Sequence, residues 1–342
     1  MKIMHEVPLA LYSTMRLGGK ANYLVHVRGK EELMDALDWA DRRELSVLMI
    51  GSGSNIIWRD EGFNGLVVVN EFPGYEVTNE DDKDYFIRVG AGENWDGVVA
   101  RSVADNASGI EALSLIPGTA GATPVQNVGA YGQEISQTLD SVEAYDRETR
   151  NFIILSNKEC GFNYRSSIFN TTAKGRYFIT YLNFHLYRTH MQPPFYSSLQ
   201  DYLSQRNITN YSPQNIRKAV YEIRTSKLPD PAKIANNGSF FANPVIDQDA
   251  FNELAARYPD IKHWPTNDGK YKLSAAWLIE KAGFKDMHDH ETGMATWFSQ
   301  PLILVNESAK TTNDLMIFKK KIVDIVQEIF NVTLSQEPEL LP

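Results

Sequence analysis

Cysteine is nearly absent from this sequence, in which Cys160 is the one cysteine among 342 residues. A single cysteine excludes an intrachain disulfide and a CxxC pair, suits a reducing cytosol, and is more often a small buried hydrophobe than a nucleophile. Long hydrophobic runs are also missing, since none approaches the roughly 20 apolar residues that span a membrane. His5 and Glu6 interrupt the segment in which a signal peptide would need its apolar core. We therefore expect a cytoplasmic protein that is not inserted in a membrane.

Positive charge is also scarce, because 34 Lys and Arg stand against 43 Asp and Glu, a formal net charge of −9. Nucleic-acid binding needs a basic stripe, so we expect no nucleic-acid partner. The cluster HDHE at 288–291 lacks a recognised zinc-ligand spacing, so we expect no metal site. The length and the 43% of hydrophobic residues are typical of a globular protein of two or three domains.

Glycine and proline are instead concentrated in residues 116–132, IPGTAGATPVQNVGAYG. Glycine lets a ligand approach the main chain and proline fixes φ, so this segment cannot be an ordinary helix or strand. The outward N–H groups of such a loop bind phosphate oxygens without any lysine. Loops of this length without secondary structure are uncommon in compact domains unless they are functional. We therefore interpret residues 116–132 as a ligand cradle rather than a surface connection.

A second glycine-rich turn, GSGSN at 51–55, follows a buried strand and precedes another β-like segment. A turn between two strands excludes the usual dinucleotide fingerprint, which needs a helix directly after the loop and a third glycine where Ile56 stands. Neither glycine-rich segment has the lysine of a nucleoside-triphosphate P-loop, so phosphoryl transfer is not expected. The two segments together favour a bound, non-reacting diphosphate such as that of a dinucleotide.

Hydrophobic periodicity predicts an α+β region up to about Tyr187 and a domain boundary near Leu228. Apolar residues at helical spacing predict helices at 30–45, 95–103, 216–223, 250–257, 274–282 and 314–330. Alternation and buried apolar runs predict strands at 46–50, 85–92, 141–145, 151–155, 177–187 and 301–306, with an exposed hairpin tip at 79–84. Thr311 or Thr312 can cap the last helix, and a final strand should follow it.

Several polar residues stand in contexts that suit catalysis or binding. Arg165 follows Tyr164 in CGFNYRSSIF, and its planar fork suits a carboxylate or phosphate, although a lone arginine is more often solvated or salt-bridged. Ser239 lies outside any GxSxG elbow, so it does not indicate an esterase, and a turn cap is the commoner role of a serine beside glycine. Glu337 and Glu339 lie in the tail, where exposed carboxylates are the default expectation.

The motifs STMRLGG, GSGSN, IPGTAGATPVQNVGAYG, YRSSIF, KLPDP, NNGSFFANP and ILVNE, in this order, resemble those of the UDP-N-acetylenolpyruvoylglucosamine reductases, the MurB family. The resemblance spans nearly the whole chain. It implies an α+β protein with an FAD-binding fold of the vanillyl-alcohol-oxidase (PCMH-like) type. Two flavin-binding subdomains are expected at 1–71 with 331–342 and at 72–228, and a C-terminal α+β substrate-binding domain at 229–330. Non-covalent FAD, NADPH as hydride donor and a UDP-linked amino-sugar substrate are implied as well.

The same resemblance implies the residues of the site. Ser239 resembles the proton donor, with Arg165 and a tail glutamate as its partners; counting from the leucine of FNVTL gives Glu337, and Glu339 is the alternative. Substrate contacts are implied for Tyr164, Tyr196, Lys227, Asn243, Trp264 and Gln300. FAD contacts are implied for Ile50, Gly51, Ser52, Gly53, Ser54, Asn55, Pro117, Gly118, Gly121, Ala122, Thr123, Gln126, Asn127, Gly129, Ala130, Tyr131 and Gly132.

Two of these positions mark this sequence within the family. The segment around QPPFYSS resembles the tyrosine-bearing loop of the longer type of the enzyme, which places Tyr196 over the substrate. Trp264 stands where related enzymes carry a tyrosine, so one hydrogen bond to the substrate is absent or replaced.

The implied chemistry explains why these residue types are needed. A hydride adds to the terminal carbon of the enolpyruvyl ether, and negative charge then builds up on the adjacent carboxylate. Arg165 can pair with that carboxylate, and Glu337, when protonated, can donate a hydrogen bond to it. The neighbouring carbon is strongly basic at this point, so the positioned hydroxyl of Ser239 suffices as the acid. Lys227 and its basic neighbours would meet the UDP diphosphate.

Two other functions remain open from the sequence. The same fold would serve an FAD-dependent oxidase or dehydrogenase of another alcohol or ether, although no histidine for covalent flavin attachment lies near either glycine-rich segment. A non-catalytic nucleotide-binding protein would keep those segments but would not need Ser239, Arg165 and the tail glutamate. A monomer is the expected state in each case.

Overall fold

The computed structural model describes residues 1–266 and 268–342, and its internal contacts divide the chain into two compact units. The first unit comprises Met1–Val7, Ala21–Ser52 and Asn64–Ser226, and the second comprises Pro8–Lys20, Gly53–Phe63 and Lys227–Pro342. The junction after Ser226 lies close to the boundary expected near Leu228. Residues 331–342 join Gly53–Phe63 in the second unit, because two of their strands pair. The three-part division into subdomains stays a prediction.

One sheet of the first unit has four strands in the order β1-β2-β5-β3. These strands are β1 (Met4–Pro8), β2 (Lys20–Val27), β3 (Ser46–Ile50) and β5 (Phe63–Asn70). β3 and β5 run parallel, and β5 is buried along nearly its whole length, as is typical of a strand covered on both faces. The predicted helix at 30–45 is α1 (Lys30–Asp41), which buries four apolar residues at helical spacing. It ends earlier than predicted.

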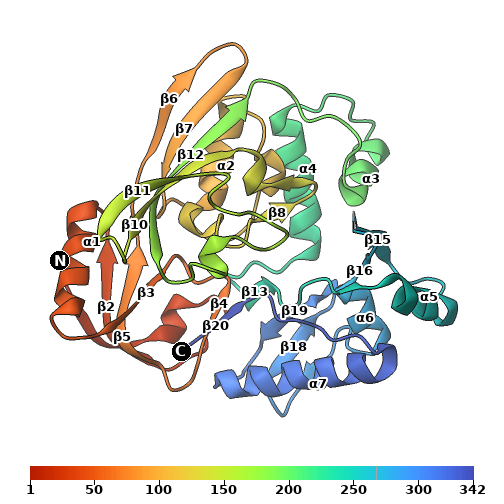
Figure 1. Ribbon diagram of the computed structural model, residues 1–342. Helices are drawn as coiled ribbons and strands as arrows, with labels where there is room; N and C mark the ends of the chain where they lie inside the picture. The colour runs from red at the N-terminus through yellow and green to blue at the C-terminus, as the bar shows by residue number, and fades with distance from the viewer. Residues whose placement is uncertain (267) are drawn as a thin grey trace. The chain divides into compact units, whose positions relative to one another are not determined.

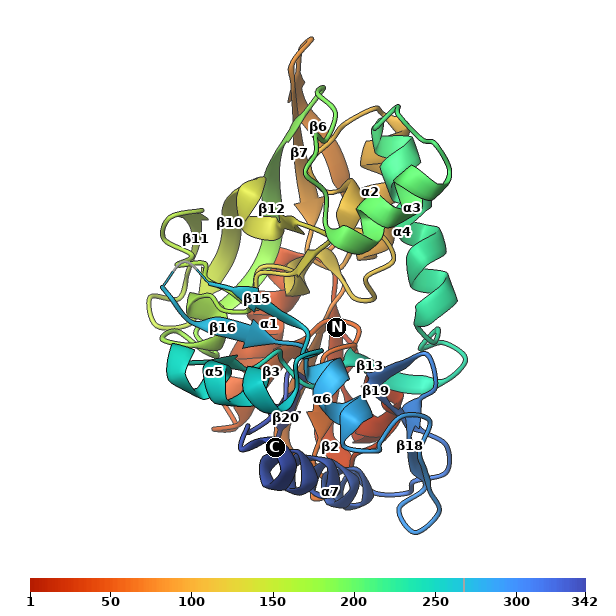
Figure 2. The same ribbon diagram turned by 90° about the vertical axis from the view of Figure 1, so that its right-hand side faces the viewer.

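A second sheet of the first unit has the order β11-β10-β12-β7-β6 and is antiparallel throughout. Its strands are β6 (Tyr75–Glu80), β7 (Asp84–Gly90), β10 (Leu139–Asp146), β11 (Asn151–Ser156) and β12 (Tyr177–Tyr187). Figures 1 and 2 show the β6–β7 hairpin extending past the other strands of this sheet. The carboxylate of Asp81 accepts the N–H groups of Lys83 and Asp84 at 2.8 Å in its exposed turn, which confirms the predicted hairpin tip.

Three helices complete the first unit: α2 (Trp95–Ala104), α3 (Ser197–Gln205) and α4 (Pro213–Lys227). α2 and α4 lie where the periodicity predicts helices. α3 lies in a polar tract in which no helix is expected, and it buries Leu199, Tyr202 and Leu203 in a small core shared with α4. Figures 1 and 2 both show these two helices side by side.

The second unit is built on three small sheets with the orders β13-β19-β18-β17, β14-β16-β15 and β20-β4. Its strands are β4 (Ile56–Trp58), β13 (Ala235–Ser239), β14 (Val245–Ile246), β15 (His263–Pro265), β16 (Tyr271–Leu273), β17 (His288–Asp289), β18 (Met294–Trp297), β19 (Gln300–Asn306) and β20 (Glu339–Leu341). The strand predicted at 301–306 is therefore β19, and the predicted final strand is β20. β4 confirms that GSGSN connects two strands rather than a strand and a helix.

The helices of the second unit are α5 (Gln248–Arg257), α6 (Ala275–Lys281) and α7 (Thr312–Phe330). α7 begins with a capping box in which the Thr311 hydroxyl accepts the N–H of Asp314, so Thr311 is the cap. Its face of Leu315, Phe318, Ile322, Val326 and Phe330 is buried in the core of the unit. None of the helices in the described part of the chain combines the length and apolar character needed to cross a bilayer.

Candidate active site

The glycine-rich segment 116–132 belongs to the first unit and follows an irregular path. It contains the short 3-10 turn η3 (Ala120–Ala122), and β8 (Gly129–Ala130) pairs with β9 (Gln133–Glu134) just beyond it. The segment was predicted to contain no ordinary helix or strand. The structure shows one 3-10 turn and one two-residue strand within it, and the rest is irregular. A Cβ at position 121 would lie 2.6 Å from the Cβ of Ala91, so only glycine fits there. The close approach fixes the loop against the end of β7.

Asn127 holds the loop from inside. Its side chain is 1% exposed; its amide nitrogen donates to Glu134 Oε2 at 3.0 Å and to Asn163 O at 3.2 Å. The side-chain oxygen of Asn127, Oδ1, accepts the N–H of Ser136 at 3.0 Å. Asn127 also has a φ of +44°, a conformation that asparagine tolerates better than most residues. Its side chain is therefore used within the protein, so an FAD contact from this residue would come from its backbone.

The segment that carries Arg165 joins the loop from the other side. Arg165 Nη2 donates to Gly129 O at 2.9 Å, and Ser167 Oγ donates to Val125 O at 2.7 Å. Arg165 has a φ of +52°, which is uncommon for a residue with a long side chain. Tyr164 is exposed and its ring lies 5.3 Å from the Arg165 guanidinium. The structure thus brings Arg165 and Tyr164 to the predicted cofactor loop.

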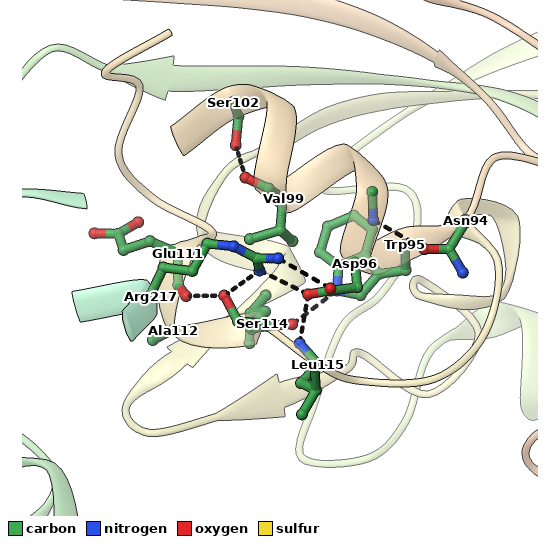
Figure 3. A network of polar contacts seen from close by, with 12 residues as sticks. Asn94, Trp95, Asp96, Val99, Ser102, Glu111, Ala112, Ser114, Leu115 and Arg217 are labelled. Carbon is green, nitrogen blue, oxygen red and sulfur yellow. Dashed lines mark hydrogen bonds and ion pairs between the residues drawn. The ribbon is translucent and has the colours of Figure 1, made fainter. Parts of the chain in front are cut away.

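A polar network holds the residues that immediately precede the loop in the sequence (Figure 3). Arg217 of α4 binds Asp96 of α2 through two hydrogen bonds of 2.6 and 2.9 Å. The same carboxylate accepts the N–H of Leu115 at 2.6 Å, and Arg217 also donates to Ser114 Oγ at 2.7 Å. Burial acts to raise the pKa of the Asp96 carboxyl, but the hydrogen bonds from Arg217 and Leu115 outweigh it and lower the pKa. Two helices thereby fix the residues that lead into 116–132.

We expect Arg217→Met to destabilise the apoprotein by about 1–3 kcal/mol, because it leaves the half-buried Asp96 carboxylate without its cation. Urea unfolding followed by circular dichroism measures the change. The matched control is Arg206→Met, which removes an exposed arginine 3.9 Å from Glu222 and should cost less than about 1 kcal/mol. Equal losses in the two variants would contradict a special role for the Asp96 pair.

A partly buried arginine of α4, Arg224, interacts electrostatically with Tyr131 at the end of the loop. Desolvation lowers the pKa of its guanidinium, and the interaction with Tyr131 opposes that shift. Burial likewise raises the pKa of the Tyr131 hydroxyl. The ring of Tyr131 makes an edge contact with the exposed ring of Tyr196, at 5.9 Å between centroids. Tyr196, predicted to cover the substrate, therefore lies against the cofactor loop.

The GSGSN turn spans the junction of the two units, with Gly51 and Ser52 in the first and the residues from Gly53 in the second. Gly53 has a φ of +74°, and a Cβ there would lie 2.1 Å from Tyr12 O. Only glycine fits this position. Thr14, from the STMRLGG motif, donates its N–H to Gly53 O at 3.1 Å. That motif therefore shapes the turn in the second unit.

Ser239 ends β13 and is exposed, next to the buried Phe240. The N–H of Glu337 donates to Phe240 O at 2.9 Å, so the main chain of Glu337 lies beside the end of β13, next to Ser239. Glu339 instead lies in β20, where its N–H donates to Asn55 O at 2.9 Å. Within the second unit, the structure thus brings Ser239 and Glu337 together and places Glu339 at the glycine-rich turn.

Four predicted substrate residues follow in the second unit. Lys227 ends α4 and is exposed, and its carbonyl accepts the Ser299 hydroxyl at 2.7 Å. Asn243 Oδ1 accepts the N–H of Ala275, the first residue of α6, at 3.0 Å, next to the N-cap residue Ser274. Gln300 begins β19. Trp264 lies in β15, with Lys272 Nζ 5.9 Å from its ring.

Other chemically notable groups serve the fold. Cys160 is fully buried, as predicted, and burial raises the pKa of its thiol to about 12, which keeps it unreactive. In HDHE, His288 binds Glu307 and Asp289 binds Lys321. A cavity of about 340 Å³ in the first unit is lined in part by Lys and Arg side chains, of which Arg150 and Arg176 pair with carboxylates. It lies at the β10–β11 hairpin, and none of the residues predicted for the site lines it.

Sequence reasoning misses three residues of this framework: Asp96, Arg217 and Asn237. Asp96 and Arg217 are 121 positions apart, and nothing in either local pattern links them. Asn237 lies two residues before Ser239, and a run of polar residues in a buried strand is the signal that could have identified it.

Comparisons with known proteins match segments in both parts of the chain. A family model described as an FAD binding domain matches residues 21–150. A second, described as the C-terminal domain of UDP-N-acetylenolpyruvoylglucosamine reductase, matches residues 230–341. The first contains the loop at 116–132, and the second contains Ser239 and Glu337.

Curated relatives share the whole length. A UDP-N-acetylenolpyruvoylglucosamine reductase of Ralstonia nicotianae is 40% identical over 337 residues, covering 98% of each chain. One of Pseudomonas putida is 38% identical over 335 residues, again covering 98% of each. The crystal structure of the Thermus caldophilus reductase (MurB) aligns over 100% of both chains with a TM-score of 0.69 and 22% identity, which shows the same fold.

Proposed function

Because this chain belongs to the UDP-N-acetylenolpyruvoylglucosamine reductase family, it is an FAD-dependent oxidoreductase, and we propose the following roles for its residues. Its reaction is the NADPH-dependent reduction of UDP-N-acetylglucosamine enolpyruvate to UDP-N-acetylmuramate, a step of peptidoglycan precursor synthesis. The observation that carries this function is the full-length match to the curated reductases, at 40% identity in the relative from Ralstonia nicotianae. A monomer in the cytoplasm is the proposed state.

The two glycine-rich segments suit FAD because their shape depends on the absence of side chains. A Cβ at Gly53 would collide with the carbonyl oxygen of Tyr12, and a Cβ at Gly121 would collide with the Cβ of Ala91. Proposed FAD contacts are Ile50, Gly51, Ser52, Gly53, Ser54, Asn55, Pro117, Gly118, Gly121, Ala122, Thr123, Gln126, Asn127, Gly129, Ala130, Tyr131 and Gly132. FAD held by these residues would supply the hydride chemistry that links NADPH to the enolpyruvyl ether.

In this proposal Ser239 donates the proton that completes the reduction. Arg165 pairs with the substrate carboxylate, on which negative charge builds up as the hydride adds. The hydrogen bond from Arg165 to Gly129 O fixes the guanidinium before the substrate arrives. Less side-chain entropy is therefore lost when Arg165 binds the substrate carboxylate. Glu337 stabilises the same charge as a hydrogen-bond donor, and its backbone link to Phe240 supports it over Glu339.

The remaining proposed roles concern substrate recognition. Lys227 meets the diphosphate, and Asn243 donates to the substrate through its side-chain amide nitrogen while its Oδ1 accepts the N–H of Ala275. Tyr164, Tyr196 and Gln300 supply further polar contacts. Trp264, in place of a tyrosine, offers an indole N–H and a larger apolar surface.

An anaerobic spectroscopic titration tests the proposed function. NADPH should bleach the flavin absorbance of the purified protein, and UDP-N-acetylglucosamine enolpyruvate should then restore it in one turnover. A flavin that NADPH bleaches but the enolpyruvyl nucleotide leaves bleached would point to another substrate. A protein that takes up no FAD would contradict the whole assignment.

A further inference from the structure

Asn237 is nearly fully buried in β13, where its side chain is tied to two other segments of the second unit. Its Nδ2 lies 3.1 Å from Thr14 Oγ1 and 3.2 Å from each of the carbonyl oxygens of Ser54 and Ile56. Main-chain carbonyls can only accept hydrogen bonds, so the amide nitrogen must face them. The orientation of the Asn237 amide is thereby fixed.

This orientation leaves Asn237 Oδ1 as a buried acceptor with no hydrogen-bond partner among the described residues. Buried polar atoms in native proteins almost always have a partner, because the desolvated acceptor otherwise costs free energy. The described residues supply no donor to this oxygen, so its donor is to be sought in a bound ligand or water molecule.

We infer that Asn237 Oδ1 accepts a hydrogen bond from a hydroxyl or ring N–H of bound FAD. The amide that carries this oxygen also holds the carbonyl of Ser54, in the GSGSN turn that is proposed to contact FAD. Two residues further on lies Ser239, the proposed proton donor to the substrate. The inference rests on the FAD dependence of the proposed function, and it makes Asn237 both a brace of the turn and a direct cofactor contact.

The Thr14 side chain gives the STMRLGG motif a part in this arrangement. Thr14 accepts Asn237 Nδ2 on its hydroxyl, accepts the N–H of Asn236 on its carbonyl at 3.0 Å, and donates its own N–H to Gly53 O. The residue thus links β13 to the glycine-rich turn. The turn and the acceptor oxygen of Asn237 are therefore held in one fixed relation before a ligand binds.

The neighbouring Asn236 is a matched control. It is as deeply buried as Asn237, but both ends of its amide are satisfied within the protein. Its Nδ2 donates to Ile234 O at 2.8 Å, and its Oδ1 accepts the N–H of Gly238 at 2.8 Å. Replacing Asn236 removes structural hydrogen bonds only, whereas replacing Asn237 also removes the acceptor assigned to FAD.

The experiment titrates apoprotein with FAD and follows the quenching of flavin fluorescence, with thermal unfolding of each apoprotein measured in parallel. We expect Asn237→Ala to raise the Kd for FAD about tenfold, the effect of losing one hydrogen bond to a buried acceptor. Asn236→Ala should lower the Tm of the apoprotein and change the Kd less than twofold. If Asn237→Ala does not fold, Asn237→Ser, which keeps a small polar group in the strand, takes its place.

The outcomes separate the inference from the proposed function. A wild-type protein that binds no FAD defeats the function itself. Wild-type binding with an Asn237 variant whose Kd stays within twofold overturns the inference and leaves Oδ1 to a water molecule. An unchanged Kd for FAD with a KM for the enolpyruvyl nucleotide raised tenfold also overturns it, since the donor then belongs to the substrate.

Discussion

The Ser239→Ala variant should turn over the enolpyruvyl nucleotide about 10²-fold more slowly than the wild type, or worse, while NADPH still bleaches its flavin at an undiminished rate. The variant lacks the proposed proton donor to the substrate. Reduction of the flavin by NADPH does not need that donor. Ser239 is exposed at the end of β13, so the change leaves the core intact. Stopped-flow absorbance measures the two half-reactions separately.

Ser335→Ala serves as the control for this variant. Ser335 is also exposed, and it holds Ala242 through its backbone carbonyl, which alanine keeps. Its turnover should stay within twofold of the wild type. Equal slowing of both half-reactions in Ser239→Ala would show that the hydroxyl supports binding or folding rather than proton transfer.

The second large effect is expected from Glu337→Gln, which should lower kcat by about 10²-fold, the usual scale for losing one group that stabilises developing charge. Glu339→Gln should lower kcat only a few-fold, because Glu339 lies in β20 beside the glycine-rich turn rather than beside Phe240. Steady-state kinetics of the two variants, with FAD content measured first, decide between the glutamates. A larger kcat defect in Glu339→Gln would transfer the role to Glu339.

Local pattern predicted much of the fold because the relevant signals are short-range. The glycine-rich turn between β3 and β4 follows from the apolar runs on either side of it, and α7 follows from its apolar stripe and its Thr311 cap. The sequence pattern did not predict α3, because its buried residues, Leu199, Tyr202 and Leu203, lie in a tract of polar residues. Its helical form depends on the core that it shares with α4, which no local window contains.

Local sequence pattern predicted fewer of the contacts that hold the proposed site residues in place. The motifs predict roles for Arg165, Ser239 and the loop, but they do not predict the contacts that hold these residues in place. Asp96 and Arg217 pair across 121 positions, and Asn237 reaches Ser54 across 183. Such contacts follow from tertiary packing, so no spacing rule could reveal the partners, although the polar run in the buried strand β13 points to Asn237 itself.

The pairing of β20 with β4 has a consequence for folding during synthesis. Glu339–Leu341 runs parallel to Ile56–Trp58, and the second unit also includes Pro8–Lys20. The first unit can fold once the ribosome has released the chain to Ser226, since domains fold as they emerge. β4, within Gly53–Phe63, gains its partner strand only when β20 has been made. During that interval β4 is an unpaired edge, and it is the part of the nascent chain for which a chaperone would matter most.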